Sequence, residues 1–178
     1  MNPPTASILA VPVSSRDHIR GSTAAPVTLV QYGNYQCLQC GAAYRILKRI
    51  AAQFDEQLCF VFRHFPIVRF YPNAHHAAEA AEAAASQGRF WEMHDCLFTH
   101  QYALGNGYLV DYAALLNLNI PQFLREITSD MHVSRVRDDI RGGLRSGVQR
   151  TPAFFINGIR YQGKLSEESL RQALMQAL

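Results

Sequence analysis

The chain has few charged residues and no long apolar run, which argues against several classes of protein. Only 17% of its 178 residues are charged, and 17 basic against 14 acidic residues leave a formal charge of +3. The basic residues form no long tail, so nucleic acid is not an expected partner. The arginines between residues 135 and 150 alternate with Asp138 and Asp139, which is typical of a solvated helix face. No apolar stretch reaches the roughly 18 residues of a membrane-spanning helix, so we expect no membrane insertion.

The N-terminus lacks the pattern of a secretory signal. It has no cationic start, and its longest apolar stretch, Ile8 to Val13, is broken by Pro12. We therefore expect a cytoplasmic location if Met1 is the native start. If a signal has been removed upstream, we expect a periplasmic or other extracytoplasmic location.

Cysteine is also scarce. Four cysteines are too few for a disulfide scaffold in a chain whose 48% hydrophobic content can form a substantial core. A structural zinc site needs about four ligands, and no second Cys-x-x-Cys or paired histidine stands at a suitable spacing. Cys59 and Cys96 lie in apolar surroundings and are interpreted as small buried hydrophobes. We expect no metal and no cofactor, which leaves Cys37 and Cys40 to be explained.

The first half of the chain has the pattern strand, helix, strand. Residues 1–24 are rich in Pro, Ser and Thr, as in an arm, and residues 27–32 favour a strand. Apolar residues then recur at i, i+3 and i+4 from the cysteines to about Phe54, which predicts a helix. Residues 57–65 favour a strand covered on both faces. We expect it to pair in parallel beside the first strand, in a right-handed crossover unit.

Helical periodicity dominates residues 73–148, where Gly88 is expected to end the first of several helices. Two β-segments follow on either side of Asn157 and Gly158, a residue pair that favours a hairpin turn. The chain ends in a helix that Ser166 can cap.

The first cysteine pair stands at the predicted start of a helix. The unpaired N–H groups and the positive end of the helix dipole there favour the thiolate of Cys37 over its thiol. Each unit by which a thiol pKa falls corresponds to about 1.4 kcal/mol of thiolate stabilisation. Cys37 is therefore expected to attack a disulfide, and Cys40, one turn further on, to resolve the mixed disulfide that forms. An isolated structural disulfide is a poorer interpretation, because so short a loop constrains the unfolded chain little.

Thr151 and Pro152 stand directly before the apolar residues 153–156. Proline forfeits a hydrogen bond within a strand, so it is expected at the first strand residue or in a special turn. Only about 5 to 6% of X-Pro bonds in folded proteins are cis, so the residues alone leave the isomer open.

Taken together, these features resemble the thioredoxin fold of DsbA-like thiol:disulfide oxidoreductases over about residues 17–178. The phrases that carry the resemblance are APVTLVQYGNYQC with its CLQC, FVFRHFP, AAEAAEAAASQGRFWEMHDCLF and SGVQRTPAFFINGIRYQG. The resemblance implies an α/β chain with a thioredoxin-like domain of residues 25–72 and 149–178. It also implies an inserted helical domain of residues 73–148, with residues 1–24 as an N-terminal arm.

The resemblance also implies a substrate site. Pro152 would be cis and abut the Cys37 sulfur, and the backbone at Thr151 would pair with an extended substrate peptide. Leu38 and Gln39, between the two cysteines, would complete this site. The implied partners are protein or peptide thiols and disulfides, together with a redox partner protein.

The sequence departs from the family pattern at two places. Leu38-Gln39 stands where strongly oxidising members typically have proline and histidine, and Gln39 offers only a neutral N–H. We therefore expect the thiolate of Cys37 to be less stabilised than in strong oxidants. Gln31 stands where related proteins often carry a buried acid, so the proton of Cys40 is expected to move through water or another group.

The sequence also allows a function other than catalysis. A non-catalytic thioredoxin-like module that binds a client protein is the alternative to an enzyme, and the oligomeric state is left open. Several polar residues near the start of the helical block are interpreted as fold-supporting or solvated instead of catalytic. These are Arg63, His64, Tyr71, His75 and His76.

Overall fold

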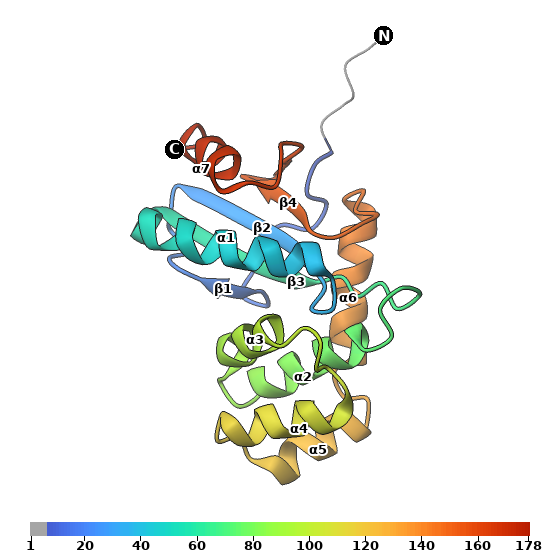
Figure 1. Ribbon diagram of the computed structural model, residues 1–178. Coiled ribbons are helices and arrows are strands. Elements are labelled where there is room, and N and C mark those ends of the chain that lie inside the picture. Colours follow the sequence, from blue (N-terminus) through green and yellow to red (C-terminus); the bar gives the residue numbers. More distant parts are fainter. Residues whose placement is uncertain (1–6) are drawn as a thin grey trace. The chain divides into compact units, whose positions relative to one another are not determined.

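The computed structural model describes residues 7–178, so the first six residues of the expected N-terminal arm lie outside the described residues (Figure 1). Its strands are β1 (His18–Arg20), β2 (Val27–Gly33), β3 (Leu58–His64), β4 (Ala153–Ile156) and β5 (Ile159–Arg160). Its helices are α1 (Leu38–Phe54), the 3-10 turn η1 (Asp55–Gln57), α2 (Ala74–Ala85), α3 (Phe90–Thr99), α4 (Asn106–Leu115), α5 (Ile120–Thr128), α6 (Val133–Arg145) and α7 (Glu167–Met175).

The described chain divides into two compact units. Unit 1 comprises the described residues up to Gly33 together with Ala42–Arg63 and Arg141–Leu178. Unit 2 comprises Asn34–Gly41 and His64–Ile140. The α/β class expected from the sequence is confirmed, since unit 1 contains the sheet and unit 2 is helical.

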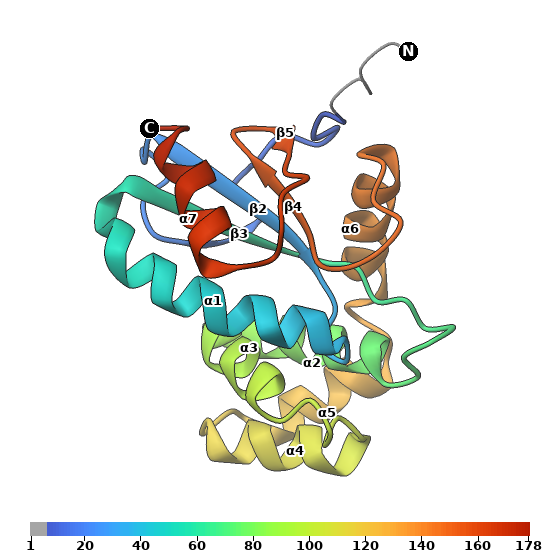
Figure 2. The same cartoon turned by 45° about the horizontal axis from the view of Figure 1, so that its top comes forward.

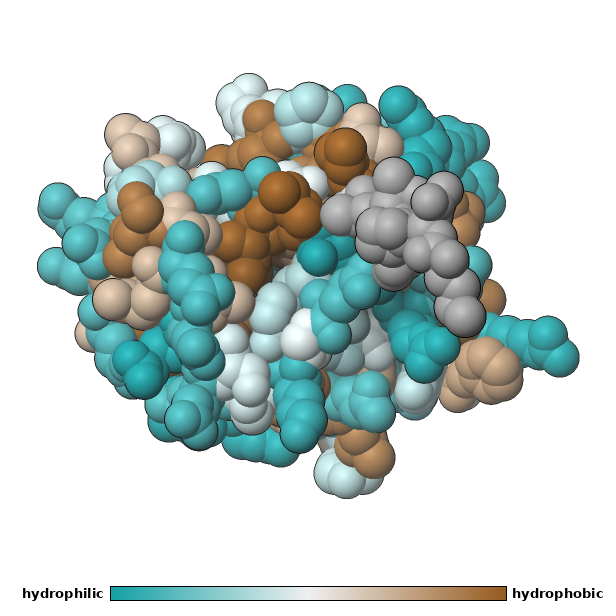
Figure 3. Space-filling model, turned by 90° about the horizontal axis from the view of Figure 1, so that it is seen from above, coloured by the Kyte–Doolittle hydropathy of each residue, from teal (hydrophilic) through white to brown (hydrophobic). Residues whose placement is uncertain are grey.

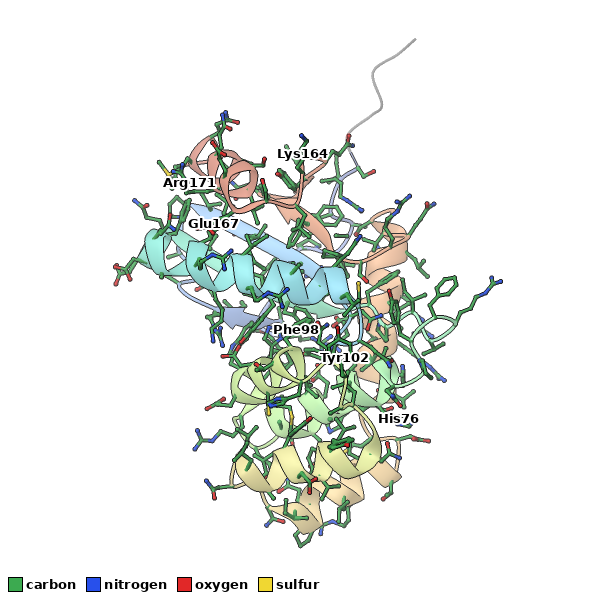
Figure 4. The ribbon with its side chains drawn as sticks, in the orientation of Figure 1. His76, Phe98, Tyr102, Lys164, Glu167 and Arg171 are labelled. Atoms are coloured by element: carbon green, nitrogen blue, oxygen red, sulfur yellow. The ribbon has the colours of Figure 1, made fainter. Side chains whose placement is uncertain are left out.

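Unit 1 is built on a five-stranded sheet of order β1-β3-β2-β4-β5. β4 pairs antiparallel with β2, with Tyr32 opposite Ala153 and Leu29 opposite Ile156. Every residue of β3 is buried, as expected for a strand covered on both faces. Figures 1 and 2 show α1 and α7 near one another on the sheet. A salt bridge joins the two helices, with Arg49 Nε 2.5 Å from Glu167 Oε2. Figure 4 labels Glu167 at the start of α7.

Short-range signals in the C-terminal part predict the structure well. Asn157 and Gly158 have positive φ angles of 47° and 82°, as the turn between β4 and β5 requires. The Ser166 side chain accepts a hydrogen bond from the Ser169 N–H at 3.2 Å and so caps α7. Both features are therefore confirmed.

The N-terminal segment contains a strand that the sequence pattern does not predict. β1 pairs antiparallel with β3, with Ile19 opposite Val61. Further upstream, the Leu9 N–H donates to the Gly158 carbonyl at 2.8 Å, and Ile8 forms an isolated bridge with Ile159. Residues in this segment therefore contribute hydrogen bonds to the sheet of unit 1, and their partners are too distant in sequence for a local pattern to indicate them.

Unit 2 contains a buried polar contact on α6 that contradicts one expectation. Asp139 is buried, and its Oδ2 accepts a hydrogen bond from the backbone N–H of His64 at 2.9 Å. Its other oxygen is bound by Arg135. The interpretation of this stretch as a solvated helix face is wrong for Asp139, because the end of β3 supplies a donor that needs a buried acceptor.

A second carboxylate of unit 2, that of Glu126 on α5, accepts several hydrogen bonds. Ser86 Oγ donates to it at 2.8 Å, Gln122 Nε2 at 2.8 Å, and His132 Nε2 lies 2.7 Å away. Burial raises the pKa of this carboxyl, but the hydrogen bonds from His132, Gln122 and Ser86 outweigh burial and lower the pKa below its ordinary value. The folded state therefore binds this proton more weakly than the unfolded state does.

We expect Glu126→Gln to destabilise the protein at pH 7 by about 1 to 3 kcal/mol, the range for hydrogen bonds to a charged group. The depressed pKa stabilises the fold fully above the unfolded pKa, and this contribution is lost as pH falls through the lower folded pKa. The variant should therefore lose less stability than the wild type between about pH 5 and pH 2. Urea unfolding at several pH values measures this, with Glu92→Gln as an exposed control expected to change little. Parallel pH curves for Glu126→Gln and wild type would contradict the assignment.

Exposed apolar residues occur on the face shown in Figure 3, which looks down on α7 and the β4–β5 hairpin. Ile8, Ile159 and Met175 are among the exposed apolar side chains of unit 1. Among the described residues, no helix has both the length and the apolar character needed to cross a membrane.

Candidate redox site

The cysteine pair lies where the sequence predicts, at the start of α1. Cys37 directly precedes the first helical residue, and Cys40 lies within the first turn. Both are free thiols, with Cys37 4% exposed and Cys40 fully buried. The first turn of α1 contains no acidic residue, so no carboxylate there opposes a thiolate at the helix N-terminus. The arrangement places two buried thiols at the N-terminal end of one helix, where the helix dipole favours an anion.

The loop that enters α1 is held by its own polar groups. Asn34 Oδ1 accepts the Gln36 N–H at 2.9 Å, and the Asn34 carbonyl accepts the Cys37 N–H at 3.1 Å. This Asx-type turn sets the direction in which the chain reaches Cys37. Gln36 in turn accepts the Asn73 N–H through its Oε1 at 2.9 Å. The redox loop is thereby joined to the segment that precedes α2.

Gln101 is a site residue that sequence reasoning missed. Its buried side-chain amide donates to the carbonyl of Tyr35 at 2.7 Å and to the carbonyl of Cys37 at 2.8 Å. Gly41 makes this approach possible, because a Cβ there would lie 1.9 Å from Gln101 Oε1. The Cys37 carbonyl also accepts the Gly41 N–H at 3.1 Å. Gln101 therefore holds the backbone at both Tyr35 and Cys37. A glutamine more than sixty residues away carries no local sequence signal for this role.

Tyr71 is the second residue that sequence reasoning did not place at the site. It lies in the loop between β3 and α2, where it is half-buried. Burial raises the pKa of the Tyr71 phenol most, and the hydrogen bond to Cys37 and the charges of Cys37 and Cys40 raise it further. The phenol therefore keeps its proton at neutral pH and can act as a donor.

A cluster of aromatic and polar side chains lies behind the redox loop in unit 2. The Tyr35 hydroxyl and His94 Nδ1 are 3.1 Å apart, and the ring centroids of Tyr35 and Phe98 are 4.8 Å apart; Figure 4 labels Phe98 on α3. His64 Nε2 lies 2.8 Å from Glu82 Oε1, and both residues are buried. Burial, followed by the negative charges of Glu82 and neighbouring aspartates, raises the pKa of Tyr35 well above its ordinary value. Tyr35 is therefore a neutral hydrogen-bonding core residue.

The residues between the cysteines are open to solvent. Leu38 is 58% exposed and Gln39 is also exposed, so both can contact a bound partner. Thr151 is buried and Pro152 is half-buried directly before β4, and the peptide bond between them is cis. These two residues belong to unit 1, whereas the cysteines belong to unit 2.

Gln31 on β2 is a buried residue of unit 1, and its side-chain nitrogen has no hydrogen-bond partner among the described residues. An amide cannot ionise, so this position supplies no titratable group. Where related proteins often carry a buried acid, this strand therefore carries a neutral side chain whose hydrogen bonding is incomplete.

The two other cysteines differ from the pair. Cys59 is buried in β3, and burial raises its pKa, so its thiol is a poor nucleophile. Burial likewise raises the pKa of Cys96, although this residue on α3 is half-buried instead of fully buried as expected. Neither thiol lies at a helix start, since Cys59 is within β3 and Cys96 is near the end of α3.

The remaining polar candidates have structural surroundings. Arg63 is buried against Asp17, and His64 pairs with Glu82. His75 and His76 lie 3.5 Å and 3.7 Å from Glu79 Oε1 on α2, and Figure 4 shows His76 on the outside of the helical unit. The geometry agrees with a fold-supporting or solvated role for Arg63, His64, His75 and His76.

The described residues combine a five-stranded sheet, a helix begun by Cys-x-x-Cys and a helical unit, and together they form a thioredoxin-like fold. A family model described as thioredoxin matches residues 14–176, and the chain belongs to this family. The fold is similar to that of BdbD from Bacillus subtilis, with a TM-score of 0.86, 20% identity, and coverage of 97% of this chain and 98% of that one. It is also similar to α-DsbA1 from Wolbachia pipientis, with a TM-score of 0.81, 20% identity, and coverage of 95% and 94%.

Curated proteins that are more similar in sequence than these solved structures are named as Na(+)/H(+) antiporters. The chain is 41% identical over 170 residues to the Na(+)/H(+) antiporter NhaA 1 of Salinispora arenicola. The match covers 95% of this chain but only 26% of that protein. The chain therefore spans about a quarter of the length of these relatives.

Proposed function

We propose that the chain is a thiol:disulfide oxidoreductase that exchanges disulfides with protein or peptide thiols through Cys37 and Cys40. The observation that carries this proposal is the pair of free thiols at the start of α1, Cys37 directly before the first helical residue and Cys40 within the first turn. A thiolate at Cys37 attacks a substrate disulfide, and Cys40 then attacks the Cys37 sulfur and releases the substrate. The fold shared with DsbA-like proteins supports this assignment.

The substrate site in this proposal comprises the exposed Leu38 and Gln39 together with Thr151 and Pro152. An extended substrate segment would pair with the backbone at Thr151, as in main-chain recognition by strand addition. A redox partner protein would return the cysteine pair to its starting state after each cycle. No metal or cofactor enters the reaction, because both electrons are held by the sulfur pair.

The test is an equilibrium titration of the cysteine pair against glutathione. We expect one reversible two-electron transition, and a double variant with Cys59→Ala and Cys96→Ala should show the same transition. A potential near about −120 mV would identify an oxidant, and one near about −270 mV a reductant. Because Gln39 replaces an ionisable neighbour, we expect a value closer to the reductant. A pair that does not titrate reversibly would overturn the proposal.

A second candidate is a non-catalytic module that binds a client protein. The similarity of nearly the whole chain to a quarter of an antiporter relative favours it, since the matching segment there is part of a longer protein. In that case the chain would bind its partner through the same exposed residues without turnover. Stable binding of a partner by a double Cys37→Ser, Cys40→Ser variant, with no reversible thiol titration in the wild type, would favour this candidate.

A further inference from the structure

The backbone carbonyls of Tyr35 and Cys37 share one donor group. Gln101 Nε2 lies 2.7 Å from the first oxygen and 2.8 Å from the second, and all three residues belong to unit 2. A side-chain amide has two N–H groups, so one amide serves both carbonyls. The Cys37 carbonyl also accepts the Gly41 N–H at 3.1 Å, at the start of α1. The turn that carries Cys37 is therefore held by its own helix and by Gln101.

Gln101 is itself placed by contacts that do not involve its side chain. It lies after α3 in a turn where the Ala103 N–H donates to the His100 carbonyl at 2.8 Å. The Tyr112 hydroxyl of α4 donates to the Ala103 carbonyl at 2.8 Å. Gln101 is 9% exposed, whereas its neighbour Tyr102, labelled in Figure 4, is 92% exposed. The amide therefore points inward from a turn that α4 holds in place.

Gly41 leaves the space that this amide occupies. A Cβ added at Gly41 would lie 1.9 Å from Gln101 Oε1. Glycine is a poorer helix former than alanine, so helix stability alone favours alanine near the start of α1. Contact with Gln101 explains why the smaller residue stands there.

We propose that Gln101 is a positioning residue for thiol–disulfide exchange, whose amide holds the turn at Cys37 in the form that favours the Cys37 thiolate. This inference rests on the proposed function. Carbonyl oxygens carry partial negative charge, whereas the N–H groups at a helix start carry partial positive charge. Because Gln101 donates to the carbonyls of Tyr35 and Cys37, these two oxygens oppose an anion at the sulfur less, and the helix dipole stabilises it more effectively.

Gln101 exchanges neither protons nor electrons. The Cys37 thiolate bonds to one substrate sulfur, and the other substrate sulfur leaves as a thiolate with the electron pair of the broken bond. The Cys40 thiolate then bonds to Cys37 and expels the first substrate sulfur, so the pair loses two electrons and the substrate gains two. Cys37 is charged as a thiolate and neutral in a disulfide, so Gln101 favours the reduced pair. Loss of the amide should make the pair a stronger reductant.

The first test is Gln101→Met in the full chain, which removes both N–H donors and keeps a side chain of similar length. The readout is the pH dependence of Cys37 alkylation by iodoacetamide, located by peptide mass spectrometry, together with thiolate absorbance. Below neutral pH we expect the thiolate fraction of Cys37 to fall by about threefold to tenfold. The potential against glutathione should become more reducing.

Gln87→Met is the matched control, because Gln87 makes the same kind of contact with backbone outside the redox loop. Its Oε1 accepts the Asn119 N–H at 2.7 Å, and its Nε2 donates to the Asn119 carbonyl at 3.3 Å. Its loss reports any general destabilisation of unit 2. We expect a lower melting temperature and an unchanged Cys37 profile.

Gly41→Ala tests the same contact without altering Gln101. The new Cβ displaces the flexible glutamine side chain, while alanine strengthens the helix. We expect the Cys37 profile to move in the same direction as in Gln101→Met, and the double variant to move no further than the single variants. A weakened helix cannot produce this result.

Two results would overturn the inference. The first is a Cys37 profile that superimposes on wild type in folded Gln101→Met, or in Gly41→Ala if Gln101→Met does not fold. The second is a profile that Gln87→Met displaces as far as Gln101→Met does, since the effect would then come from general destabilisation. Failure of the proposed function shows instead in the wild type, as a cysteine pair that glutathione does not titrate.

Discussion

The variant Cys37→Ser is expected to reduce insulin no faster than dithiothreitol alone, whereas Cys40→Ser is expected to accumulate disulfide-linked partners. The difference follows from position, since Cys37 directly precedes the first residue of α1, whereas Cys40 lies one turn further on and is fully buried. Without Cys37, no sulfur at the helix start can attack an incoming disulfide. Without Cys40, the attack still occurs, but the mixed disulfide on Cys37 has no neighbouring thiol to resolve it.

Insulin turbidity measures the first expectation, and non-reducing electrophoresis followed by mass spectrometry measures the second. Cys59→Ser and Cys96→Ser are the matched controls, since burial raises the pKa of both thiols and neither should change the rate. Full activity of Cys37→Ser would refute the assignment of the nucleophile. Trapping by Cys37→Ser instead of Cys40→Ser would reverse the two roles.

The parts of the site and fold that are predictable from sequence depend on neighbours along the chain. Cys37 and Cys40 stand at a helix start that apolar periodicity reveals, and the Asn157-Gly158 turn needs only two residues that tolerate positive φ. The N-cap at Ser166 likewise involves a donor three residues away. Each of these features is determined by a local backbone requirement, which a short pattern can express.

The parts that were not predicted depend on partners far apart in sequence. β1 has only three residues, and it becomes a strand because β3 offers an edge forty residues later. Gln101 is an ordinary polar residue in its own segment, and only folding brings its side chain to the backbone carbonyl of Cys37. Such a hydrogen bond depends on how the folded chain brings two distant segments together. It requires no particular pattern of residues around Gln101, so helix or strand periodicity does not reveal it.

The hydrogen-bond partners of Arg63 are also far from it in sequence. Replacing this residue is expected to have the largest effect on stability of the changes considered. Its guanidinium donates through Nε to Asp17 Oδ1 at 2.7 Å and through a terminal nitrogen to Asp17 Oδ2 at 3.0 Å. It also donates to the Val11 carbonyl at 2.8 Å, the Pro12 carbonyl at 3.0 Å and the Tyr32 hydroxyl at 3.1 Å. Burial lowers the pKa of Arg63, but the bonds to Asp17 and Tyr32 outweigh burial and raise it, so the group stays charged.

Replacing Arg63 with leucine should therefore destabilise the fold by about 3 to 5 kcal/mol, because it leaves the Asp17 carboxylate buried and unpaired. The side chains of this pair are 3% and 5% exposed. Arg49, 56% exposed and paired with Glu167, is the matched control, and Arg49→Leu should cost only about 0 to 1 kcal/mol. Urea unfolding monitored by far-UV circular dichroism gives both values.

A double variant separates the loss of the pair from the cost of the unpaired charge. Arg63→Leu combined with Asp17→Leu removes both charges, so it should be less destabilised than Arg63→Leu alone. Arg63→Lys should recover only part of the loss, because one ammonium cannot reproduce a guanidinium that reaches Asp17, two carbonyls and a phenol at once. If Arg63→Leu cost no more than Arg49→Leu, the buried ion pair would contribute nothing beyond a surface pair. Residues 11–17 would then be held to unit 1 chiefly by β1 and the contacts around it.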